Sequence, residues 1–293
     1  MIPSKDLKLG MLYAFLAYLG WGFFPIYWKF LNHVPLLQIL SHRVLWAFVF
    51  YTLILIYKNR KLIFFKPENK KTFFSLTLAS MLLMGNWLVY IYSINSNQIV
   101  ESSLGYFINP LVNILVGVLF LKERLSKYQT TAVVLAAIGV LIISLDQRQI
   151  PWIALFLAIS FSCYGLIKKL NPLSGLKSNQ FESFIFFPIA LAYLLSQPHD
   201  WVTPQNIAPS VALLVGSGVI TGLPLVFFAE ATRRLPYYLM GFFQFLSPTL
   251  QFLSGVLIFS EPLSNLKLKG FAFIWLAGIV LILNMWLKTK HRT

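Results

Sequence analysis

The chain consists of apolar runs of about 20 residues, separated by short segments that hold most of its charges. A helix of that length crosses the hydrocarbon core of a bilayer, which is about 30 Å thick. The pattern therefore predicts an all-α membrane protein with ten transmembrane helices in two sets of five. The first set lies at Leu9–Leu31, Leu36–Tyr57, Phe73–Asn95, Val100–Leu121 and Tyr128–Leu145, and the second at Ile150–Leu170, Asn179–Gln197, Pro209–Ala231, Pro236–Phe259 and Leu266–Leu287.

One stretch of the chain occurs twice. Leu104–Ser126 returns 138 positions later as Phe242–Ser264, with a proline, a glycine and a glutamate at matching places. Such a repeat indicates two homologous halves, which we assign to residues 1–146 and 147–293. Because each half holds an odd number of spans, the second must enter the bilayer from the opposite side. Inverted repeats of this kind are common in secondary transporters, whose substrate sites lie near the midplane between the halves.

A narrow polar stripe follows both copies of the repeat at spacings of three and four residues, which place it on one face of a helix. It consists of Tyr106, Asn109 and Asn113 in the first copy and of Gln244, Ser247 and Gln251 in the second. One interpretation is that these groups only join neighbouring helices by hydrogen bonds. Their matched positions favour another, in which the two stripes face each other and form the wall of a substrate-binding cavity.

Three further residues are candidates for bending or gating. Pro110 and Pro248 occupy the middle of their predicted spans, where a proline removes a backbone hydrogen bond and kinks the helix. Such kinks serve either packing or movement during a transport cycle. Arg43 lies about two turns inside the second predicted span. It either extends its charge to the outer headgroups or acts inside the bundle as a gate or an anion contact.

Aromatic and amide residues in other spans are additional candidates for the cavity wall. Trp21 and Tyr164, each followed by a glycine, occupy corresponding places in the first and sixth spans. Their rings combine an apolar body with one hydrogen-bond donor, which suits an amphipathic solute, although such rings also occur in membrane interfaces and cores. Similar candidates are Asn86, Trp87, Tyr90 and Thr221.

Composition and charge agree with a membrane protein. Apolar residues make up 58% of the 293 residues and charged residues only 11%, too few polar groups for a water-soluble globule of this size. The net charge of +15 comes from clusters between the spans. With a cytoplasmic N-terminus, 19 lysines and arginines fall on inner segments and five on outer ones, so both termini are expected in the cytoplasm. This distribution argues against nucleic-acid binding.

The acidic residues are predicted to have structural roles. Glu101 and Glu182 lie at the starts of spans, where carboxylates favour the positive end of the helix dipole. Glu230 is expected to pair with Arg233 or Arg234, and Glu261 to lie in a turn. Since Cys163 is the only cysteine, a disulfide within the chain is excluded.

Several strings along the whole chain resemble one known family. They are AYLGWGFFPIYWK at 17–29, HRVLW at 42–46, NWLVYIY at 86–92, ESSLGYFINPLVN at 101–113, LPLVFFA at 223–229, RRLP at 233–236 and FLSPTLQF at 245–252. Through them the chain is similar to EamA-type members of the drug/metabolite transporter superfamily, and among these to the RarD-type permeases of bacterial inner membranes. The resemblance implies a ten-helix exporter of small organic solutes, metabolites or drugs, such as chloramphenicol-like or amphipathic and aromatic compounds, without a cofactor.

The function expected from these observations is secondary transport by alternating access around a central cavity. A passive channel is the alternative, although a charge ring or carbonyl filter would be expected of one. A membrane-embedded enzyme is disfavoured, because no HExxH, GxSxG or phosphate-loop string occurs. The expected partners are a small-molecule substrate and the lipid bilayer, for a monomeric protein, with an oligomer left open. The energy source is left open between a proton gradient and the substrate gradient. The first span holds no carboxylate, unlike the smallest members of the superfamily, which argues against proton-coupled export of cationic drugs.

Overall fold

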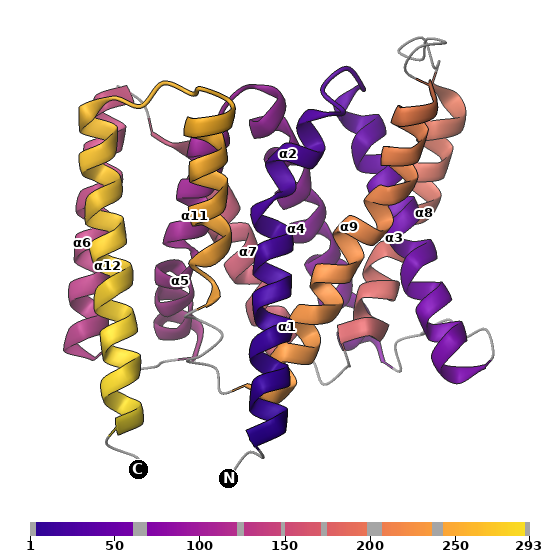
Figure 1. Cartoon of the computed structure of the whole chain (residues 1–293). Coiled ribbons are helices and arrows are strands. Elements are labelled where there is room, and N and C mark those ends of the chain that lie inside the picture. Colours follow the sequence, from indigo (N-terminus) through magenta and orange to yellow (C-terminus); the bar gives the residue numbers. More distant parts are fainter. Residues whose placement is uncertain are drawn as a thin grey trace.

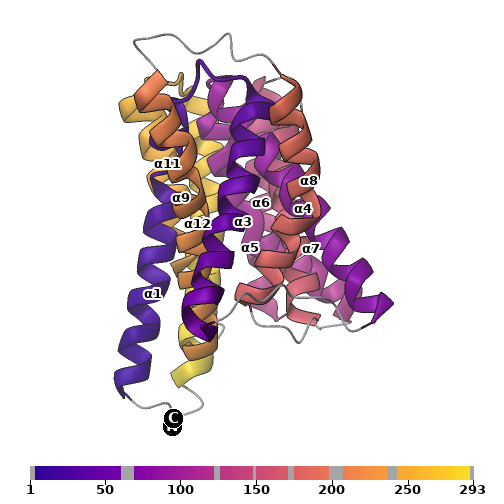
Figure 2. The ribbon, with the colours of Figure 1, turned by 90° about the vertical axis from the view of Figure 1, so that its right-hand side faces the viewer.

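The computed structural model describes residues 4–60, 69–121, 126–147, 150–170, 175–197, 207–235 and 243–290. All regular structure in these residues is helical, and the helices stand side by side as one bundle (Figure 1). The first residues of α1 and the last residues of α12 lie at the same end of that bundle (Figure 1). A view turned by 90° shows that the helices form more than one layer, with α1 and α8 on opposite sides (Figure 2).

Each helix falls on one of the predicted windows. The elements are α1 (Ser4–Gly22), α2 (Phe24–Lys29), α3 (Leu36–Asn59), α4 (Lys70–Asn95), α5 (Ile99–Leu121), α6 (Lys127–Gln147), α7 (Trp152–Leu170), α8 (Gly175–Ser196), α9 (Ile207–Arg234), α11 (Leu246–Leu253), the π-helix η1 (Ser254–Ile258) and α12 (Asn265–Lys290). Within the described residues, six helical stretches are long and apolar enough to cross a membrane. The prediction of an all-α membrane protein is therefore confirmed.

The first predicted span is divided in two. α1 ends at Gly22, and α2 begins at Phe24 with Pro25 in its first turn. Proline has no N–H to donate and its ring clashes with the carbonyl four residues back, whereas the first turn of a helix needs no such donor. The helix is therefore interrupted just before Pro25, and the carbonyl of Trp21 loses its usual partner.

The second copy of the repeat also differs from the predicted kinked helix. Pro110 does lie inside the continuous helix α5, but Pro248 is the third residue of α11, after a turn at Gln244 and Phe245. The prediction that Pro248 lies in the middle of a helix is therefore wrong for the described residues, because the first turn of a helix accepts proline without losing a hydrogen bond. Residues 236–242 of the same predicted span lie outside the described part of the structure.

Helix contacts follow a regular pattern across the bundle. α1 packs against α9 and α11, and α7 packs against α4 and α5. α3 contacts α8, α5 contacts α11, and α6 contacts α12 at one edge of the bundle (Figure 1). At the last crossing, a Cβ on Gly139 would lie 2.6 Å from the carbonyl oxygen of Gly270, and a Cβ on Gly270 would lie 2.8 Å from that of Gly139. The two glycines thus allow the backbones to touch.

Two glutamates join helix ends between neighbouring elements. Glu261, expected in a turn, accepts hydrogen bonds from the backbone N–H groups of Ile99 and Val100 at 2.7 and 2.8 Å, and so caps α5. Glu101 accepts from the N–H of Ile153 at 3.1 Å and caps α7 instead of its own helix. Carboxylates at these N-terminal N–H groups favour the positive end of the helix dipole. Both caps therefore fix the relative height of two helices.

Candidate functional site

The described residues enclose a small cavity between the helices, where the two copies of the repeat meet. It has a volume of about 70 Å³, which is room for a few water molecules. Its walls are aromatic rings and amides, together with one arginine. The lining residues are Tyr18, Trp21, Phe24, Arg43, Leu83, Asn86, Trp87, Tyr90, Tyr106, Asn109, Phe161, Thr221, Leu225, Gln244, Ser247, Pro248 and Gln251.

Most residues predicted as candidates lie on this cavity. Those that line it are Trp21, Arg43, Asn86, Trp87, Tyr90, Tyr106, Asn109, Thr221, Gln244, Ser247, Pro248 and Gln251. Tyr164 and Pro110 are absent from its wall, and the side chain of Asn113 lies outside the described part of the structure. Sequence reasoning missed Tyr18, Phe24 and Phe161, because an aromatic ring that faces a cavity has the same sequence pattern as one that faces lipid or core.

Side chains from the two copies of the repeat are in direct contact. The Gln244 amide donates to Asn109 Oδ1 at 2.6 Å and joins α5 to the segment before α11. Gln251 Nε2 donates to Ser247 Oγ at 3.0 Å and to the carbonyl oxygen of Trp21 at 3.1 Å. That carbonyl is the one left without an N–H by Pro25. The polar stripe of the second copy therefore closes the break in the first span.

Amides on the first half of the chain also hold α7. Asn86 donates to the carbonyl of Leu157 at 3.0 Å and to Ser160 Oγ at 2.9 Å. Asn109 makes a similar pair of bonds to the same helix, to the carbonyl of Ala158 and to the Ser162 hydroxyl, both at 3.0 Å. These two amides therefore join neighbouring helices by hydrogen bonds, and both also line the cavity.

Arg43 is the charged residue of the cavity wall. Its side chain does not extend to the headgroups, because the residue is only 2% exposed. The Nε group donates to Thr221 Oγ1 at 2.9 Å. The guanidinium carbon lies 4.0 Å from the ring centroid of Trp87 and 5.0 Å from that of Trp28, distances at which a ring face attracts a cation. Its Nη1 atom is buried and has no hydrogen-bond partner.

A second polar cluster lies beside the cavity and corrects two predictions. Glu182 does not cap a helix, because its side chain is 2% exposed and forms an ion pair with Lys168 Nζ at 2.7 Å. The Tyr164 hydroxyl donates to the same carboxylate at 3.1 Å, which turns this residue away from the cavity. Lys168 also donates to Asn179 Oδ1 at 3.0 Å. Sequence spacing could not reveal the cluster, because its members come from two helices. The expected pair of Glu230 and Arg234 is present at the end of α9.

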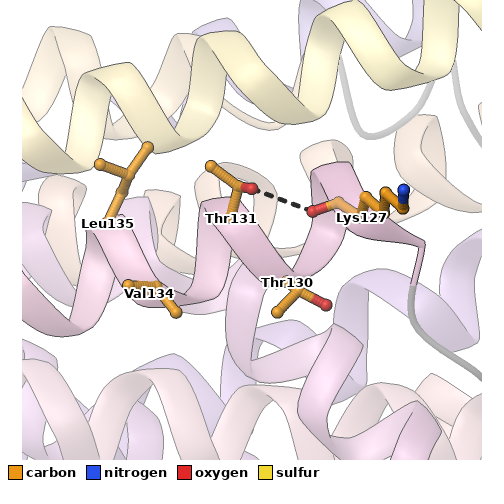
Figure 3. Close-up of a pocket in the computed structure, with 5 residues that line it drawn as sticks. All are labelled: Lys127, Thr130, Thr131, Val134 and Leu135. Atoms are coloured by element: carbon orange, nitrogen blue, oxygen red, sulfur yellow. Dashed lines mark hydrogen bonds between the residues drawn. The ribbon is translucent and has the colours of Figure 1, made fainter.

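A hollow on the surface of α6 offers much less to a solute. Its wall is formed by Lys127, Thr130, Thr131, Val134 and Leu135, all from one helix (Figure 3). The Thr131 hydroxyl donates to the carbonyl of Lys127 at 3.0 Å (Figure 3), so its polar group is already satisfied by its own helix. We therefore place the candidate site in the central cavity.

A bundle of apolar helices around a polar and aromatic cavity agrees with a transporter, and comparisons with known proteins place the chain among transporters. The chain belongs to the EamA-like transporter family, whose sequence model matches residues 8–145. It is 41% identical over 280 residues to an uncharacterized transporter of Bacillus subtilis, YojE, with 94% of each chain covered. It is 37% identical to the protein RarD of Escherichia coli, with 100% of this chain and 99% of RarD covered.

The fold is also found among solved structures. One crystal structure superposes with a TM-score of 0.66 over 94% of this chain and 98% of its own, at 16% sequence identity. Identity that low supports the fold alone.

Proposed function

We propose that this protein is a secondary transporter that moves small organic solutes across the bacterial cytoplasmic membrane by alternating access. The observation that carries the proposal is the cavity, because its wall combines Trp21, Asn86 and Asn109 with Gln244 and Gln251 from the other end of the chain. A site between two parts of a bundle can be exposed to either side when those parts rock against each other. Aromatic and amide groups suit an amphipathic solute.

We further propose that the bundle consists of ten spans in two inverted halves, 1–146 and 147–293. The helix contacts support this arrangement. Helix α1, in the first span of the first half, packs against α9 and α11, which belong to the third and fourth spans of the second half. Helix α7, the first span of the second half, packs against α4 and α5, the third and fourth spans of the first half. Contacts between α3 and α8, between α5 and α11, and between α6 and α12 each join equivalent spans. A pseudo-twofold axis in the membrane plane requires such a pattern.

The size of the cavity favours a transport cycle over a passive channel. At about 70 Å³, the cavity is smaller than a typical small-molecule site of about 300–1,000 Å³. A solute of ordinary size would therefore need the helices to separate before it could be accommodated, as in a cycle between closed and open states. We propose export as the direction of transport, from the resemblance to RarD-type permeases. We propose that both termini lie in the cytoplasm, from the positive-inside distribution of charge.

Efflux from liposomes tests the function. The full chain would be reconstituted into liposomes loaded with aromatic and amphipathic solutes, chloramphenicol among them, and efflux would be followed at increasing solute concentration. Saturable, protein-dependent efflux of at least one solute is expected. Efflux that rises linearly, together with electrical conductance across a planar bilayer, would favour the channel instead. If no solute of this class moves, the proposal is wrong.

A further inference from the structure

The charge of the cavity wall defines the class of solute that the cavity can accept. Among the described residues that line it, Arg43 is the charged one, and neither aspartate nor glutamate contributes to the wall. The ion pair between Glu182 and Lys168 lies in the neighbouring cluster and satisfies its own charges. A buried charge without a counter-charge costs several kcal/mol. A solute that brings one negative charge to Arg43 would remove that cost.

The guanidinium group is held in a position to bind an anion. Thr221 accepts from its Nε at 2.9 Å, and the ring centroids of Trp87, Trp28 and Phe24 lie 4.0, 5.0 and 5.6 Å from its carbon atom. These contacts orient the group but leave the Nη1 atom buried and without a partner. The planar fork of arginine matches the two oxygens of a carboxylate, which gives stronger hydrogen bonds than a neutral acceptor does.

Two more polar atoms of the wall are buried and without partners. They are the hydroxyl of Tyr90 and Oε1 of Gln251, both on residues that line the same cavity. The hydroxyl can donate to an anion, whereas Oε1 can only accept. A ligand that satisfies all three atoms therefore carries an anionic group together with a separate N–H or O–H donor. Buried polar groups in proteins are nearly always satisfied, so these three atoms, each on a residue of the cavity wall, are the candidates for contacts with a ligand.

We propose that the central cavity binds a small organic monocarboxylate with an aromatic or apolar body and one hydrogen-bond donor, and that Arg43 holds its carboxylate. The inference rests on the proposed function and names its substrate class. A monoanion fits better than a dianion, because the wall supplies one positive charge. Rings of Trp21, Trp87 and Phe161 on the wall supply surfaces for the apolar body.

Three probes of one shape and different charge test this proposal. They are 4-hydroxyphenylacetate, its neutral amide 4-hydroxyphenylacetamide, and the cation tyramine, each titrated calorimetrically into the full chain in lipid nanodiscs. We expect the carboxylate to bind at least about tenfold more tightly than the amide, equivalent to about 1.4 kcal/mol, and tyramine to bind more weakly than both. Equal affinities, tighter binding of the amide or of tyramine, or no binding of the carboxylate would overturn the proposal.

Variants then assign the carboxylate to Arg43. Arg43→Gln is expected to abolish the preference for the carboxylate, whereas Arg60→Gln, the same change at an exposed helix end, leaves it intact. Preference retained in Arg43→Gln would overturn the role of Arg43. If Arg43→Gln does not fold, Arg43→Lys keeps the charge without the fork and is expected to weaken carboxylate binding, and the ranking of the probes on the unaltered protein still decides the solute class.

Flux of the same probes separates this inference from the proposed function. Saturable transport of the amide or of tyramine but not of the carboxylate would support the proposed transport function but overturn a monocarboxylate as the substrate class. Binding of the carboxylate without flux of any probe would support the site and overturn transport. Saturable flux of 4-hydroxyphenylacetate, inhibited by other small aromatic carboxylates, is the expected result.

Discussion

Single residues in the cavity wall carry more than one role, because a membrane interior offers few polar groups. The amides of Asn86 and Asn109 hold α7 by its carbonyl and hydroxyl oxygens, yet both also face the cavity. Gln251 reaches back to the carbonyl of Trp21. In hydrocarbon, each backbone carbonyl needs a partner from within the protein. A substitution in the wall is therefore expected to change both stability and transport.

Gln251→Leu tests the link to the interrupted first span. Leucine cannot donate to the Trp21 carbonyl, and Pro25 has no N–H to replace the lost bond. We expect the free energy of unfolding to fall by about 1–3 kcal/mol, measured by thermal or denaturant unfolding in detergent, and solute flux to fall with it. Gln197→Leu, the same change after the end of α8, is the control. Unchanged stability and flux in Gln251→Leu would contradict this link.

The ion pair between Lys168 and Glu182 is a second residue-scale test. Lys168→Met leaves the Glu182 carboxylate, 2% exposed, without its cation, and such a loss typically costs about 3–5 kcal/mol. The double variant Lys168→Met/Glu182→Leu removes both charges and is expected to recover most of the free energy of unfolding. Losses that simply add in the double variant would show that the two residues do not act as a pair.

At the scale of elements, the close approach of α5 to α7 places the cavity wall. Both amides that line the cavity from the first half bind α7, and Glu101 at the start of α5 caps it. The approach depends on Gly105, where a Cβ would lie 2.7 Å from the carbonyl oxygen and 3.0 Å from the Cα of Ala154. Since both atoms belong to the backbone, they cannot move aside as a side chain could.

Gly105→Ala is accordingly expected to push α5 away from α7 and to lower the free energy of unfolding by about 1–3 kcal/mol. The matched control is Gly165→Ala in α7, where a Cβ would meet no atom within 4 Å. There the same substitution is expected to be neutral, or to stabilise by about 0.5–1 kcal/mol through helix propensity. Thermal unfolding of the two variants in the same detergent compares them directly, and equal effects would argue against a backbone contact at Gly105.

At the scale of the whole molecule, the proposed function depends on how the chain is inserted in the membrane. The start of α1 and the end of α12 lie at the same end of the bundle (Figure 1), in agreement with an even number of membrane crossings between them. From the distribution of lysine and arginine along the sequence, we expect that end to face the cytoplasm. Two inverted halves of five spans each require the two ends of the chain to lie on the same side of the membrane.

Labelling of single cysteines tests this orientation. Cys163 is the only cysteine of the chain, so one substitution, Cys163→Ser, provides a cysteine-free background. Ser4→Cys and Lys290→Cys are expected to react with a membrane-impermeant maleimide only after the cells are permeabilised. Asn32→Cys, exposed between α2 and α3, is expected to react in intact cells. Opposite labelling of Ser4→Cys and Lys290→Cys would contradict an even number of crossings.

Much of the fold could be predicted from the sequence, whereas the site could be predicted only in part. The apolar windows gave helix positions to within a few residues, because hydrocarbon thickness dictates helix length. The repeat indicated that Asn109 and Gln244 belong to related surfaces, and the structure joins them by a hydrogen bond. The partners of Tyr164 and Glu182 were not predictable, because sequence spacing describes one helix at a time.

The sequence by itself determined that this protein lies in a membrane as a bundle of helices, that it resembles EamA-type transporters, and which helix faces are polar, because length, charge and periodicity are local properties of a chain. Only the tertiary structure decided which polar groups satisfy one another and which remain without a partner. The break before Pro25 and its closure by Gln251 are separated by more than 200 residues in sequence. The unpartnered Nη1 of Arg43 depends in the same way on what every neighbouring helix places around it. Such balances of charge and hydrogen bonds exist only once the helices have packed.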